Sequence, residues 1–102
     1  MKLTAITKWE QSSFHGTTIN TTPSSLLNLA KKNNLSYCDY NDGEDKTNFD
    51  FSFQAGEDLQ FTVYNWKEYR PLNLESTYLF HIGGKDKNST DKAKSLLIKL
   101  IK

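Results

Sequence analysis

The chain has 102 residues, a formal net charge of +1 and 36% hydrophobic residues. This length and composition predict one small folded domain over residues 1–102 with a lean core. They exclude a membrane-spanning helix, since no apolar run approaches about 18 residues, and a single cysteine forms neither an internal disulfide nor a zinc site. The balanced charge gives no reason to expect sequence-specific nucleic-acid binding.

The N-terminal third predicts two weak strands and a helix. The strands are expected over residues 2–9 and 17–20, with a turn near 12–16 that exposes His15. Thr22 followed by Pro23 is a typical helix start, because a threonine caps the orphan N–H groups and proline suits the first helical position. Four residues share the buried face of this helix, with Leu27 beside them: Leu26, Leu29, Ala30 and Asn33. Asn33-Asn34 predicts that the chain leaves this helix through a residue in the left-handed conformation.

The middle of the chain alternates apolar and polar residues with the period of a β-strand. Phe49, Phe51 and Phe53 form one alternating run, and Leu59, Phe61 and Val63 form the next after a turn at 55–58. Residues 77–82 predict a third strand that stops at Gly83-Gly84. Arg70-Pro71 is expected to end the second strand, because proline cannot donate to a ladder.

The last segment predicts a helix that packs on the core. Ser89 or Thr90 is expected to cap it, with Asp91 in the first turn. Its apolar residues recur at helical spacing, at Ala93, Leu96, Leu97, Leu100 and Ile101. The element order β-β-α-β-β-β-α predicts an α+β fold, an antiparallel sheet of about five strands with two helices packed on one face.

The acidic segment 39–45 does not predict a metal site. With Asp39 in the first position of a calcium loop, the required glycine would fall at Glu44 and the last ligand at Asp50 instead of glutamate. We expect no metal and no cofactor, and interpret residues 41–43 as a turn. Cys38 is expected to be a small buried residue.

The charge is distributed unevenly. Residues 39–58 carry a net charge of −6 and residues 85–102 carry +4. Two interpretations follow. One is a solvated acidic loop and a solvated basic helix face. The other is a bipolar surface that steers a charged partner or pairs with a second copy.

The candidate site follows from strand parity. If the phenylalanines face the helices, then Tyr64, Trp66, Leu79 and His81 lie together on the other face of the sheet, where they are exposed or covered by a loop, the first strands or a partner. Tyr, Trp and Arg are enriched at binding hot spots. The predicted contact set is therefore Tyr64, Trp66, Lys67, Tyr69, Arg70 and His81.

Three other interpretations stay open beside this one: a nucleotide ligand, an acid/base enzyme and a homo-oligomer. Aromatic rings that stack on a base and cations that pair with phosphate would suit a nucleotide. Glu68 and His81 would form an acid/base pair if they lie within reach. The aromatic face would also suit a homo-oligomer.

The sequence Tyr-x-Trp-Lys-Glu-Tyr-Arg-Pro at 64–71, followed by Phe-His-Ile-Gly-Gly at 80–84 and a terminal helix, resembles a family of short uncharacterised bacteriophage proteins. The Thr-x-Pro-Ser-x-Leu helix start is similar too. The resemblance covers about residues 17–102. It implies action in a bacterial cytoplasm, where such a protein would antagonise a host defence system by binding a host protein or by sequestering a nucleotide signal.

Overall fold

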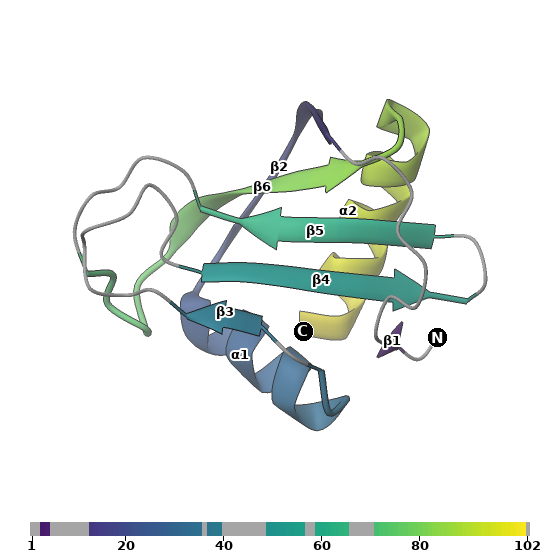
Figure 1. Ribbon diagram of the computed structural model, residues 1–102. Helices are drawn as coiled ribbons and strands as arrows, with labels where there is room; N and C mark the ends of the chain where they lie inside the picture. Colours follow the sequence, from purple (N-terminus) through teal and green to yellow (C-terminus); the bar gives the residue numbers. More distant parts are fainter. Residues whose placement is uncertain are drawn as a thin grey trace.

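A computed structural model describes residues 3–4, 13–35, 37–39, 49–56, 59–65 and 71–101. They form an antiparallel sheet and two helices, so the predicted α+β class is confirmed (Figure 1). The elements in chain order are β1 (Leu3–Thr4), β2 (Ser13–Thr21), α1 (Pro23–Lys32), β3 (Tyr37–Asp39), β4 (Phe49–Ala55), β5 (Leu59–Tyr64), β6 (Tyr78–Gly84) and α2 (Lys87–Ile101).

The strands are ordered β1-β4-β5-β6-β2 across the sheet. The short strand β3 also pairs with β4, so β1 and β3 occupy opposite ends of the same β4 edge. The sequence did not predict β3, which lies in a segment without apolar alternation. Among the described strands, β2 forms the other edge of the sheet.

The core lies between the sheet and the helices. α2 packs across β2, β5 and β6, and α1 contacts α2 and β4 (Figure 1). The predicted parity is confirmed, because the alternating apolar side chains of three strands are fully buried toward the helices: Phe49, Phe51, Phe53, Phe61, Val63, Phe80 and Ile82. Neither helix among the described residues is long and apolar enough to cross a membrane.

Helix α1 forms as its sequence predicts. The Thr22 hydroxyl accepts a hydrogen bond from the Ser25 N–H at 3.1 Å, which makes Thr22 the N-cap. Leu26 and Ala30 are fully buried. Asn34 has a φ of 57°, so the chain leaves the helix through a left-handed residue.

Helix α2 begins earlier than predicted. Asp86 caps it, since its carboxylate accepts the Ser89 N–H at 2.8 Å. Ser89 and Thr90 are buried inside the helix, so the predicted cap is wrong. The error arises because the first helical turn carries no apolar residue to mark it. The predicted apolar stripe is confirmed: Ala93 and Leu97 are buried, and Leu96, Leu100 and Ile101 pack beside them.

The predicted turn near 12–16 is wrong for residues 13–16, which belong to β2. Gly16 has a φ of 90° and lies where the register between β2 and β6 shifts, so the chain forms a β-bulge instead of reversing. His15 is therefore half-buried within the strand, and its Nε2 lies 3.0 Å from the Gly84 carbonyl oxygen.

Strand β2 is tied to α2 by hydroxyl groups. The buried Thr17 hydroxyl donates to Asp91 Oδ1 at 3.0 Å and lies 2.7 Å from the Thr90 hydroxyl. Asp91 also pairs with Lys87 at 3.1 Å. The helix is thereby held along the edge strand of the sheet.

Candidate functional site

A row of four side chains crosses the sheet face opposite the helices. In the β-ladder Tyr64 is the partner of Asp50 on one side and of His81 on the other, and His81 in turn is the partner of Thr18. Partners in adjacent strands point to the same face. The predicted juxtaposition of Tyr64 and His81 is thus present, and we call this surface the open face.

An aromatic cluster is centred on His81. The Phe14 ring stacks on the imidazole, with ring centroids 4.4 Å apart and planes 19° from parallel. The Tyr64 ring meets it edge-on, with centroids 5.5 Å apart and an angle of 75°. Such stacked and edge-to-face pairs hold each other in fixed orientations. The bulge at Gly16 lies before the regularly paired part of β2. Phe14 precedes the bulge, and its ring nevertheless contacts His81.

The sequence did not single out two members of this site, Phe14 and Asp50. Phe14 lies in a segment that predicts a turn, and its position depends on the bulge. Asp50 alternates with buried phenylalanines, and that alternation is the signal that would have placed its carboxylate on the open face beside Tyr64.

The pKa shifts of the three titratable groups in the cluster all favour the neutral form. Partial burial lowers the pKa of His81 below its ordinary value of 6.5. Burial raises the pKa of the Tyr64 hydroxyl, and the charge of Asp50 raises it further. Burial also raises the pKa of Asp50 above 3.8. At neutral pH these directions favour a neutral hydroxyl on Tyr64 and a neutral imidazole on His81.

Large apolar side chains flank the cluster in solvent. Phe14 is 45% exposed and Leu79, two residues before His81 on β6, is 48% exposed. Among the described residues of β2, β5 and β6 that share this face, none carries a full charge when His81 is neutral: Phe14, Thr18, Asn20, Gln60, Thr62, Tyr64, Leu79 and His81. A surface of this kind favours contact with another macromolecule.

Four of the six predicted contact residues lie outside the described residues: Trp66, Lys67, Tyr69 and Arg70. Glu68 of the alternative acid/base pair lies outside them too. Tyr64 and His81 are described and adjacent. The acid/base pair of Glu68 and His81 stays a prediction. The acidic loop at 40–45 and the side chain of Cys38 also lie outside the described residues. Within the described part of the chain, no group of three His, Cys, Asp or Glu side chains is placed to hold a metal ion.

We expect His81 to make stability depend on pH. Its folded pKa lies below the unfolded value of 6.5, so the unfolded chain binds more protons between these values. Stability should fall as pH decreases through about 6.5 and level off below the folded pKa. The variant His81→Phe keeps the stacked ring and removes the titration. Urea unfolding from about pH 7.5 to 5 should show the parent losing more stability than this variant, and equal pH slopes would contradict the assignment.

Comparison with protein-family models, curated proteins and solved structures finds no match to this chain.

Proposed function

We propose that the chain is a small binding protein that docks a partner protein through the open face. The observation that carries the proposal is the exposure of Phe14 and Leu79 on either side of His81. Exposed apolar side chains around a fixed aromatic cluster are typical of interface centres, where aromatic residues are enriched and charged ones depleted.

The lack of lysine and arginine among the described open-face residues favours a protein partner over a nucleotide ligand. A phosphate group is recognised by arginine, lysine or backbone N–H groups, and the described residues of the open face present no lysine or arginine. Lys67 and Arg70, which the sequence predicts as contacts, would add the cations that a nucleotide requires. A nucleotide signal is therefore the alternative that the experiment must separate.

The resemblance to short bacteriophage proteins supplies the setting for the proposal. The partner would be a bacterial host protein, met in the cytoplasm, and the binding would block a defence function. This part of the proposal rests on the resemblance and on Tyr64 and His81 being neighbours within the motif that carries it.

The test is affinity capture from a bacterial lysate with matched variants. Leu79→Ser removes an exposed apolar side chain from the open face, and Leu74→Ser removes a similarly exposed one from the turn before β6, where Leu74 is 42% exposed. Trp66→Ala and Arg70→Ala probe the remaining predicted contacts. Removing an interface anchor typically weakens binding at least about tenfold.

The expected result is a captured protein that Leu79→Ser and Trp66→Ala lose and Leu74→Ser retains. Capture that is unchanged in both Leu79→Ser and Trp66→Ala would overturn the proposal. Equilibrium dialysis against a nucleotide mixture forms the second arm. Saturable nucleotide binding that Arg70→Ala abolishes, without any captured protein, would replace the protein partner with a nucleotide.

A further inference from the structure

The outer edge of β2 carries little of the protection that is usual for an edge strand. Among the described residues no strand pairs with this edge, and an added strand would bond to its outward backbone N–H and carbonyl groups. Natural edges are guarded by lysine, proline or a bulge. The nine residues of β2 include no charged residue and no proline. The bulge interrupts only the first half of β2. The second half, from Thr18 to Thr21, pairs in regular register and contains no bulge.

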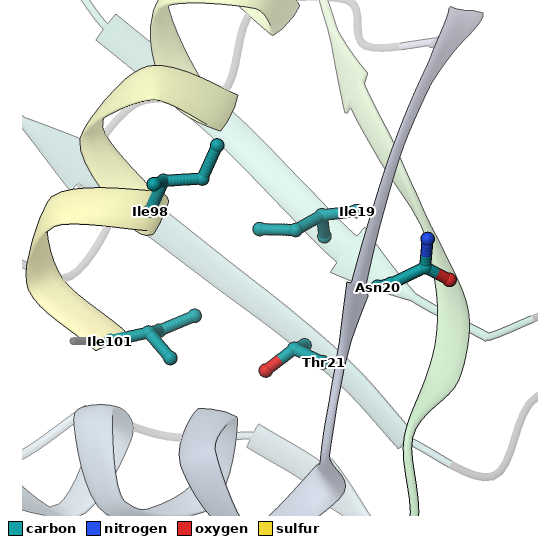
Figure 2. A pocket seen from close by; sticks show the side chains of 5 residues that line it. All are labelled: Ile19, Asn20, Thr21, Ile98 and Ile101. Atoms are coloured by element: carbon teal, nitrogen blue, oxygen red, sulfur yellow. The ribbon is translucent and has the colours of Figure 1, made fainter.

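An apolar pocket opens beside this unguarded segment. It has a volume of about 160 Å³ and lies between β2 and the last turns of α2, lined by Ile19, Asn20, Thr21, Ile98 and Ile101. Figure 2 shows Ile19 and Thr21 projecting from β2 toward the two isoleucines of the helix, with Asn20 turned away. A cavity of roughly 150 Å³ accepts a benzene ring, so this pocket is large enough for one aliphatic or aromatic side chain.

The pocket and the edge fit one ligand geometry together. A strand added to β2 would place alternate side chains on the same side as Ile19 and Thr21, and one of them would enter the pocket. In strand addition the main chain provides hydrogen bonds and such pockets provide the sequence preference.

A lysine side chain, Lys94, lies one helical turn from the pocket residue Ile98. Lys94 precedes Ile98 by four residues, so the two side chains lie on the same side of α2. Among the described residues, the other charges along this seam are Asp91 and Lys87, which pair with each other at 3.1 Å. The positive charge of Lys94 also acts on Asp91, and the three groups together leave the seam with one excess positive charge. One helical turn is about 5.4 Å and two extended residues span about 6.6 Å, so a carboxylate two residues from the pocket residue would reach Lys94.

The size of the edge favours a short peptide over a second copy of the chain. Four regular residues extend about 13 Å, and the edge adds a single side-chain pocket. A stable dimer buries about 800 Å² on each partner, which is more than such an edge offers.

We propose that the Thr18–Thr21 edge and its isoleucine pocket bind an extended acidic peptide from a partner protein by strand addition. The peptide would insert one apolar side chain into the pocket and place an aspartate or glutamate two residues away, beside Lys94. This edge borders the open face at Thr18 and Asn20, but its pocket lies on the helix side of the sheet, against Ile98 and Ile101, so it would be a second binding function.

The test is selection from an mRNA-display library of random octapeptides on the folded protein. Four further baits are used in parallel: Ile98→Ser, Lys94→Glu, Leu79→Ser and Lys92→Glu. Lys92 is exposed and lies on nearly the opposite side of the helix from Lys94, which makes Lys92→Glu the matched charge control. Peptides that are enriched are then synthesised, and their affinities are measured for every bait.

The expected result is enrichment of peptides with one apolar residue and an acid two positions away. Ile98→Ser should weaken their binding about tenfold or more, and Lys94→Glu should shift the enriched residue to lysine or arginine. Lys92→Glu and Leu79→Ser should change neither the affinity of the enriched peptides nor the preference for an acidic residue.

Three results would overturn the proposal. The first is enrichment no greater than on the Ile98→Ser bait. The second is peptide binding that depends on Leu79, which would assign it to the open face. The third is a concentration-dependent dimer in light scattering that Ile98→Ser abolishes, which would make a second copy the occupant of the edge.

Discussion

Truncation of Phe51 to alanine is expected to remove about 3–5 kcal/mol of stability. The side chain is fully buried in the centre of β4. Its ring stacks between those of Phe49 and Phe53, at centroid distances of 6.2 and 6.0 Å, and Tyr37 of β3 packs against it at 5.6 Å. The loss would be a large part of the roughly 5–15 kcal/mol that holds a small domain folded.

Urea unfolding followed by circular dichroism measures this loss. Phe51→Leu keeps a large apolar side chain and should lose clearly less. Leu79→Ala, at a side chain that is 48% exposed on the open face, should change stability by no more than about 0.5 kcal/mol. A Phe51→Ala variant as stable as Leu79→Ala would mean that the phenylalanine ladder is not the core.

The alternation of these phenylalanines explains why the fold class was predictable. A period of two places every second residue on one face, and Phe49, Phe51 and Phe53 leave no choice about which face is buried. The same parity predicts Tyr64 on the face opposite the helices, and His81 beside it if Tyr78, Phe80 and Ile82 face the helices. The caps and stripes of α1 are similarly local, so they were predictable too.

Features that depend on distant contacts were not predictable in this way. Gly83 and Gly84 look like the end of a strand, yet both belong to β6. A Cβ atom at Gly84 would lie 3.0 Å from the Thr90 Cγ2 atom, so a larger residue would require the Thr90 side chain to shift where α2 approaches the sheet. That requirement arises from packing between elements and leaves no periodic signal in the sequence.

The candidate site shows the same division. Tyr64 and His81 were found from parity, because each lies in a strand with clear alternation. Phe14 was missed, because its place against His81 depends on a bulge at Gly16 that local sequence patterns equate with a turn. A site assembled across a bulge requires the register of both strands, and register is set by the whole sheet.

Replacement of Asn65 by leucine is expected to cost about 1–3 kcal/mol, although it places an apolar side chain in a buried position. Asn65 directly follows β5 and is fully buried. Its side-chain oxygen accepts the Phe49 N–H at 2.9 Å. The asparagine thus satisfies the first residue of β4 at the point where the β5 ladder ends, and leucine would leave that buried N–H without its acceptor.

The variant Asn65→Asp separates the loss of the acceptor from the introduction of a charge. A carboxyl group keeps an oxygen in the same place, but burial disfavours its ionised form and raises its folded pKa above the unfolded value of about 3.9. The folded state then binds more protons than the unfolded state, so stability relative to the parent falls as pH rises through that interval. The measurement is the free energy of unfolding at two pH values. At about pH 4 we expect Asn65→Asp to be about as stable as the parent, and at about pH 7 we expect it to be much less stable.

Asn65→Leu should be less stable than the parent by nearly the same amount at both pH values. If Asn65→Leu matched the parent, the Phe49 N–H would have to find another acceptor, and its hydrogen bond to Asn65 would not be what stabilises the start of β4.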